Sequence, residues 1–167
     1  MMKQFLRFGN IALILLFVAA CSSARDGVDK LPESGFYGNG GNGVYGNYPA
    51  GSQQEFQQGV GDRVFFETDS SSLTAEAQSI LDRQAVWLNQ YSQHNITIEG
   101  HADERGTRQY NIALGGRRAA AVRAYLLSRG IESTRLQTTS FGKERPVSVC
   151  NDISCWSQNR RAVTIVR

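Results

Sequence analysis

The sequence lacks clustered basic charge, a long hydrophobic run and a histidine-rich motif, and each absence excludes a class of function. Its 18 Lys and Arg stand against 15 Asp and Glu and are scattered, whereas nucleic-acid binding needs clustered Lys and Arg. The apolar run at residues 11–20 is shorter than the roughly 20 residues of a membrane-spanning helix. With two histidines and no G-x-S-x-G sequence, the usual parts of a hydrolase site are missing as well.

The first twenty residues have the pattern of a bacterial export signal. Lys3 and Arg7 precede the short apolar run, as in secretory signal peptides. The run ends in Val18-Ala19-Ala20-Cys21, which resembles a lipobox and implies cleavage before Cys21 and acylation of its sulfur; the alternative is a secreted protein with a free cysteine. Ser22 follows instead of an aspartate, which in Gram-negative lipoproteins implies the outer membrane. At about 0.8 kcal/mol per buried CH₂, two or three acyl chains would hold the protein in outer-membrane lipid.

The next forty residues are rich in glycine and asparagine, as in the segment GFYGNGGNG at 35–43. Such a segment buries too little apolar surface to offset its ordering entropy, and its reach as a flexible coil is roughly 35 Å. The G-x-G-x-x-G match at 38–43 has neither a strand before it nor a helix after it, so it does not predict a dinucleotide site. The sequence thus predicts a signal peptide at 1–20, a lipidated Cys21 with a flexible linker at 21–61, and a folded domain at 62–167.

The domain is predicted to alternate strands and helices. Strands are expected at 64–66, 96–99, 136–141 and 162–166, from short apolar or alternating runs. Thr74 and Thr107 can cap helices that run to about Tyr91 and to Ser128, and a short helical turn is expected near 157–160. The order β-α-β-α-β-(α)-β predicts an α/β (α+β) two-layer sandwich, with helices packed on a mixed four-stranded sheet.

One stripe of the second helix carries the sharpest signal for a binding site. Asn111, Leu114, Arg118 and Val122 are spaced by 3, 4 and 4 residues, so they share a helix face that turns Arg118 inward. A buried guanidinium needs a partner, and Asp103 in the preceding loop could supply it. Two interpretations remain open: a structural ion pair, or two groups that open onto a cleft and share a zwitterionic ligand.

These residues belong to a pattern that resembles the peptidoglycan-associated lipoprotein family, part of the larger group that shares the OmpA C-terminal domain. The resemblance covers about residues 62–167. Its motifs here are GHADERGT at 100–107, YN at 110–111, LG at 114–115, RRA at 117–119 with Val122, FGKERP at 141–146 and NRRAV at 159–163.

The resemblance implies a binding role for specific residues. Asp103 and Arg118 would contact the diaminopimelate of the peptidoglycan stem peptide, whose free end bears an ammonium and a carboxylate; a guanidinium can fork onto such a carboxylate. Leu114 would line the apolar wall of the groove. Thr68 and Asp69 match the rim loop of the family, and Asn111 is expected to brace the junction of loop and helix. Arg118→Ala is expected to abolish binding to diaminopimelate-type sacculi while leaving the fold intact.

The resemblance also implies partners and a location. Besides peptidoglycan, these would be TolB and other Tol proteins, within the Tol-Pal system that supports envelope integrity and outer-membrane constriction in cell division, with the domain facing the periplasm. The alternative is a structural envelope protein that docks other proteins without binding peptidoglycan directly.

The remaining chemistry-bearing residues predict neither a cofactor nor an enzyme. His101, Asp103 and Glu104 lie close in sequence, but the second histidine, His94, lies before the strand, so a metal site is not expected. No carboxylate pair indicates a glycosidase. Cys150 and Cys155 form an even pair suited to a disulfide in an oxidising compartment, with two reduced thiols as the alternative.

Overall fold

The structure is a computed structural model that describes residues 48–167; the predicted signal peptide, Cys21 and residues 22–47 of the predicted linker lie outside this range. Its elements are η1 (Glu55–Gly61), β1 (Arg63–Phe65), α1 (Ala75–Gln90), β2 (Ile96–His101), α2 (Arg108–Ser128), η2 (Ser133–Arg135), β3 (Leu136–Gly142), α3 (Ile153–Asn159) and β4 (Arg161–Val166). None of the helices described is both long enough and apolar enough to cross a bilayer.

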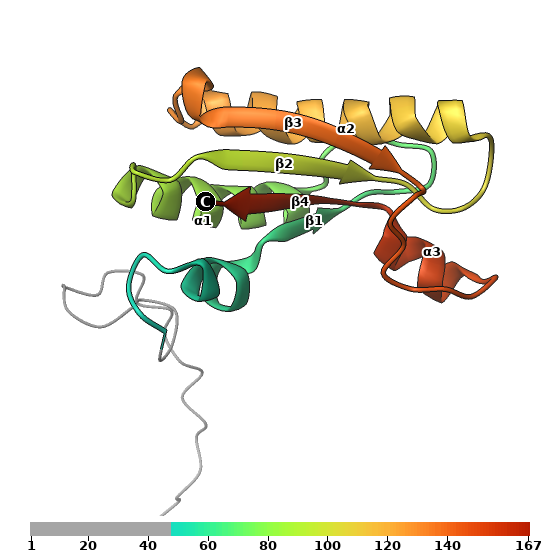
Figure 1. Cartoon of the computed structure of the whole chain (residues 1–167), viewed down its shortest axis with the longest axis horizontal. Coiled ribbons are helices and arrows are strands. Elements are labelled where there is room, and N and C mark those ends of the chain that lie inside the picture. Colours follow the sequence, from blue (N-terminus) through green and yellow to red (C-terminus); the bar gives the residue numbers. More distant parts are fainter. Residues whose placement is uncertain (1–47) are drawn as a thin grey trace, which may run out of the picture. The chain divides into compact units, whose positions relative to one another are not determined.

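The four strands form one mixed sheet in the order β1-β4-β2-β3. β4 pairs antiparallel with both β1 and β2, whereas β2 and β3 run parallel. Figure 1 shows α1 and α2 on the same face of the sheet, and α3 beyond the end at which β4 begins. The predicted two-layer α/β architecture is therefore confirmed, and the core lies between the sheet and these two helices.

Both long helices begin at the predicted threonine caps. The Thr74 hydroxyl accepts a hydrogen bond from the Ala77 amide at 3.2 Å, and the Thr107 hydroxyl accepts one from the Tyr110 amide at 3.2 Å. Each hydroxyl satisfies one of the amide groups that the first helical turn leaves without a partner. The caps fix where α1 and α2 start, and hence where the loops before them end.

The last helix begins earlier than predicted. The sequence indicated a turn near 157–160, but α3 starts at Ile153 because the Asp152 carboxylate caps it, accepting from the Ser154 amide at 2.7 Å. A disulfide joins Cys150, just before this cap, to Cys155 inside the helix, as the cysteine spacing favoured. Together they make the segment before β4 a compact turn.

The folded part also begins before residue 62, the predicted boundary. η1 buries Phe56 and Val60 completely in the core. The Glu55 carboxylate is buried with them and accepts hydrogen bonds from the Trp87 indole Nε1 and the Gly51 amide, each at 2.8 Å. Phe56 and Val60 are four residues apart, but a single apolar pair among glutamines and glycines is too short a pattern to predict a helix, so the sequence places this segment in the linker.

α2 lies unusually close to the sheet because two glycines face each other. A Cβ on Gly115 would lie 2.7 Å from the carbonyl oxygen of Gly100 in β2, and a Cβ on Gly100 would lie 1.9 Å from that of Gly115. Any side chain at either position would force helix and sheet apart. At Gly116 a Cβ would meet only the Ser140 side chain, at 4.0 Å, so the structure gives no packing reason for that glycine.

Candidate functional site

Arg118 is fully buried, and its partners are backbone carbonyls instead of a carboxylate. Its Nε donates to the Ser70 carbonyl at 2.8 Å, Nη1 to that of His101 at 2.7 Å and Nη2 to that of Glu67 at 3.1 Å. Burial lowers the pKa of Arg118 to about 10, so the side chain still carries its charge at neutral pH. The guanidinium thereby ties α2 to the loop after β1 and to the end of β2.

The ion pair that the sequence offered as one interpretation does not form. Within the described part of the chain, Asp103 pairs with Arg105, at 2.7 Å, and lies 3.5 Å from Arg160 Nη1. Burial by itself would raise the pKa of Asp103, but the hydrogen bonds and charge of Arg105 hold it below its usual range. Asp103 is therefore an ionised carboxylate at neutral pH, held by arginines other than Arg118.

A hollow of about 250 Å³ lies where β1 and β2 end and α2 begins; we call it the rim groove. It gathers five of the six residues predicted to bind ligand, namely Thr68, Asp69, Asp103, Asn111 and Leu114, together with Arg105, Gly106 and Tyr110. The sixth, Arg118, is not among the lining residues because loop backbone covers its guanidinium. The expectation that Arg118 opens onto the cleft is therefore wrong for this structure.

The walls of the rim groove are held by hydrogen bonds between loop and helix. Asn111 is buried and its amide donates to the Arg105 carbonyl at 2.7 Å, which is the bracing contact predicted for it. The Tyr110 hydroxyl donates to the Asp69 carboxylate. Asp69 has a φ of 55°, a conformation that aspartate tolerates better than most residues. This turn lets the Asp69 carboxylate face the groove.

Sequence reasoning missed two residues of this groove. The Arg105 guanidinium lies 4.3 Å from the centre of the Trp156 ring while it holds Asp103. Tyr110 is half-exposed on the first turn of α2. Both stand in the quoted GHADERGT and YN motifs, so their presence beside Asp103 and Asn111 was the available signal.

The groove thus combines two carboxylates in its lining, the exposed Asp69 and the buried Asp103, with the exposed guanidinium of Arg105 and the buried guanidinium of Arg118 beneath. Asp69 and Asp103 can accept from an ammonium, Arg105 can donate to a carboxylate, and Leu114 offers an apolar contact. Such a set suits a small ligand that carries both charges.

Two other groups of chemistry-bearing side chains are structural. His101 is buried against Phe141, with ring centres 5.6 Å apart; burial, then the charges of Arg161 and Arg145, lower its pKa to about 4. Cys150, Asp152 and Cys155 are close enough to suggest a metal site, but both sulfurs are used in the disulfide.

The helix-covered mixed sheet, with its charged groove at the strand ends, defines the class of protein: it is an OmpA-like domain, and the OmpA family pattern matches residues 65–160. The chain is 59% identical to the peptidoglycan-associated lipoprotein of Mesorhizobium japonicum, over 92% of this chain and 88% of that protein. It is 55% identical to the protein of the same name from Agrobacterium fabrum, over 94% and 88%. The crystal structure of the peptidoglycan-associated lipoprotein from Burkholderia pseudomallei matches with a TM-score of 0.65 at 36% identity, covering 70% of this chain and 100% of that one.

The chain therefore belongs to the family of peptidoglycan-associated lipoproteins. This agrees with the family resemblance found in the sequence motifs. The family is one of non-enzymatic structural lipoproteins, as the sequence led us to expect.

Proposed function

We propose that this protein binds peptidoglycan non-covalently through the diaminopimelate of the stem peptide, and that acylated Cys21 anchors it in the outer membrane. It would then tether the membrane to the cell wall. The observation that carries the proposal is the rim groove, in which Asp69 and Asp103 lie beside Arg105 and above Arg118. The names of the relatives, which associate with peptidoglycan, support the same function.

In this proposal the free end of diaminopimelate lies in the rim groove. Its ammonium is shared by the carboxylates of Asp103 and Asp69, and its carboxylate accepts from Arg105, which moves off Asp103 to reach it. Leu114 packs against the methylene chain, and Thr68 lies at the rim. Arg118 acts from beneath: three of the five N–H groups of an arginine are used by carbonyls, and its charge favours an anionic group above it.

The same arrangement predicts selectivity between cell-wall types. A stem peptide with lysine in place of diaminopimelate has the ammonium but lacks the second carboxylate, so nothing would draw Arg105 off Asp103. The ammonium of lysine would then have to share the Asp103 carboxylate with the Arg105 guanidinium. Diaminopimelate-type walls should therefore be preferred.

The test is co-sedimentation of the full chain, kept in detergent, with purified sacculi. Asp103→Asn should weaken binding to diaminopimelate-type sacculi at least about tenfold, because a charge-assisted contact of roughly 1.5 kcal/mol is lost. Asp82→Asn is the matched control, since Asp82 pairs with Arg129 on the surface away from the groove. Equal binding by Asp103→Asn and Asp82→Asn, or equal binding of wild type to lysine-type sacculi, would contradict the proposal.

The proposed arrangement is 1–20 as signal peptide, Cys21 and the glycine-rich segment as anchor and spacer, and the folded domain in the periplasm. Weak binding to each stem suffices, because many copies on one membrane face one polymer and gain by effective concentration. TolB and other Tol proteins are the protein partners proposed, and their binding to this chain is measurable with the same Asp103→Asn and Asp82→Asn variants.

A further inference from the structure

Trp156 of α3 lies against the loop that supplies Asp103 and Arg105 to the rim groove. The guanidinium carbon of Arg105 lies over the indole face, 4.3 Å from the ring centre, well within the roughly 6 Å at which an aromatic face attracts a cation. The indole Nε1 donates to the Glu104 carboxylate at 2.7 Å. Trp156 does not line the groove itself, yet it contacts two consecutive residues of the loop that does.

The position of Trp156 is fixed from both ends of α3. Near the start, the disulfide ties Cys155, the residue before Trp156, to Cys150. At the end, the buried Asn159 bonds to the backbone at 147–148 through both the oxygen and the nitrogen of its side chain. The indole ring is therefore a fixed surface, whereas the guanidinium that lies on it belongs to a longer and more flexible side chain.

Arg105 has to change partner when the proposed ligand binds. Its Nε and Nη2 donate to Asp103 at 3.2 and 2.7 Å, and its side chain is 41% exposed. An arginine that left Asp103 for water would gain rotamer freedom, and the ligand carboxylate would then have to offset the loss of that freedom. On the Trp156 ring the guanidinium can instead move parallel to the aromatic face, because this attraction does not depend on which carboxylate it bonds.

Asp103 keeps a positive neighbour when the Arg105 side chain moves. Arg160 Nη1 is buried, has no hydrogen-bond partner among the described residues and lies 3.5 Å from the Asp103 carboxylate. The backbone amide of Arg105 also donates to that carboxylate, at 3.2 Å, and this bond does not depend on the side chain. Asp103 can therefore accept from a ligand ammonium without becoming an uncompensated buried charge.

We propose that Trp156 is a positioning residue that sets the preference for diaminopimelate: it holds the Arg105 guanidinium at the rim groove while that group passes from Asp103 to the second carboxylate of the stem peptide. The inference rests on the proposed function, in which Arg105 binds that carboxylate. Trp156 acts through Arg105 and touches no ligand. Because a stem peptide that ends in lysine does not draw Arg105 away, Trp156 contributes nothing to the binding of such a peptide.

The experiment is calorimetric titration of the full chain in detergent with two probes: a stem peptide ending in diaminopimelate, and the same peptide ending in lysine. Trp156→Leu and Trp156→Phe form a matched pair, because both lose the N–H that bonds Glu104 and only phenylalanine keeps an aromatic face. Trp156→Leu should bind the diaminopimelate peptide about fivefold more weakly than wild type and the lysine peptide equally well. Trp156→Phe should keep the preference of wild type, as should the control Gln158→Ala, an exposed residue of the same helix.

A second comparison distinguishes positioning from a general structural role. In an Arg105→Ala background, Trp156→Leu should cause no further loss of affinity for the diaminopimelate peptide, since the group that Trp156 positions is gone. A structural defect in α3 would weaken binding in both backgrounds.

The outcomes separate this inference from the proposed function. If wild type does not bind the diaminopimelate peptide, or binds both peptides equally, the proposed function fails and the role of Trp156 fails with it. If wild type prefers the diaminopimelate peptide, the proposed function stands, and three results would overturn the role of Trp156: an undiminished preference in Trp156→Leu, an equal loss in Trp156→Phe, or a further loss in the Arg105→Ala background.

Discussion

Replacing Arg118 should damage the fold as well as any binding, contrary to the expectation from the sequence. Arg118→Ala removes the donors to the carbonyls of Ser70, His101 and Glu67, which hold the loop after β1 and the end of β2 against α2. Hydrogen bonds to a charged group contribute about 1.5–3 kcal/mol each. Part of this is offset because the mutant no longer buries a guanidinium.

We therefore expect Arg118→Ala to lower the free energy of unfolding by about 3–5 kcal/mol, a large share of the roughly 5–15 kcal/mol of an ordinary domain. The free energy of unfolding of Arg118→Lys should lie between those of wild type and Arg118→Ala, because an ammonium cannot reach three separate carbonyls in the geometry of a planar guanidinium. The assay is urea unfolding of the full chain. With a slope of about 1–3 kcal/mol per molar urea, the midpoint of Arg118→Ala should fall by at least about 1 M.

The matched control is Arg117→Ala, because Arg117 is the next residue on the same helix but is exposed; its side chain lies only near the Tyr110 ring, at 5.8 Å. Its unfolding midpoint should stay close to that of wild type. If Arg118→Ala is no less stable than Arg117→Ala, the reasoning about the three carbonyls is refuted. A binding defect of Arg118→Ala alone identifies no ligand contact, and this is why Asp103→Asn is the better probe of the groove.

Two further predictions concern stability. The pKa of His101 is lowered to about 4 by burial and by the charges of Arg161 and Arg145, so the unfolded chain takes up this proton first as pH falls. The free energy of unfolding should therefore drop by about 3 kcal/mol between pH 6.5 and 4, measured by urea unfolding at a series of pH values. His101→Leu should flatten this dependence on pH, and an unchanged slope would show that His101 is not the group responsible. Gly115→Ala should be strongly destabilising, because its Cβ would meet the Gly100 carbonyl at 2.7 Å. Gly116→Ala should raise the free energy of unfolding by up to about 1 kcal/mol, the difference in helix propensity, since its Cβ meets nothing closer than 4.0 Å. Similar effects of the two substitutions would contradict the close approach of α2 to β2.

The sequence by itself determined the elements whose causes are local. Thr74 and Thr107 cap helices because a threonine hydroxyl bonds an amide three residues ahead, and this needs no information from elsewhere in the chain. The alternation at 96–99 similarly predicted β2. The groove residues Asn111 and Leu114 were found because they lie on one face of one helix, and Asp103 because it stands in the short loop that enters that helix.

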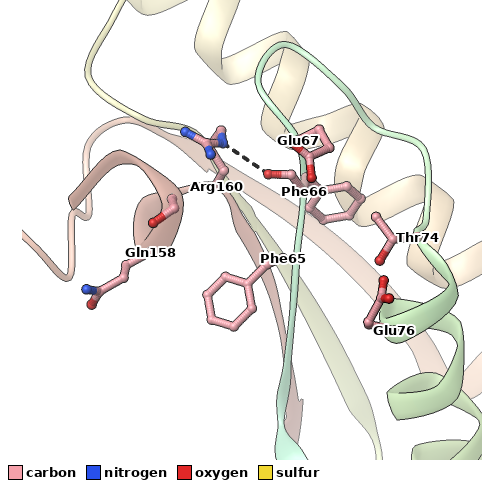
Figure 2. Close-up of a pocket in the computed structure, with 8 residues that line it drawn as sticks. Phe65, Phe66, Glu67, Thr74, Glu76, Gln158 and Arg160 are labelled. Carbon is pink, nitrogen blue, oxygen red and sulfur yellow. Dashed lines mark hydrogen bonds between the residues drawn. The ribbon is translucent and has the colours of Figure 1, made fainter. Parts of the chain in front are cut away.

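Only the tertiary structure decided the contacts that join distant segments. Arg118 faces inward, as its helical spacing predicts, but its partners are backbone carbonyls: two lie 48 and 51 residues earlier, and the third is that of His101. Because any residue type can provide a carbonyl, no side-chain pattern reveals these partners. η1 joins the core because Trp87 and Phe56 meet across the fold, although its own sequence offers only one apolar pair, too little to predict a helix. The hollow beside Phe65 (Figure 2) likewise forms where β1, α1 and α3 come together. Local rules act through neighbours along the chain, whereas these contacts depend on how the helices and strands pack.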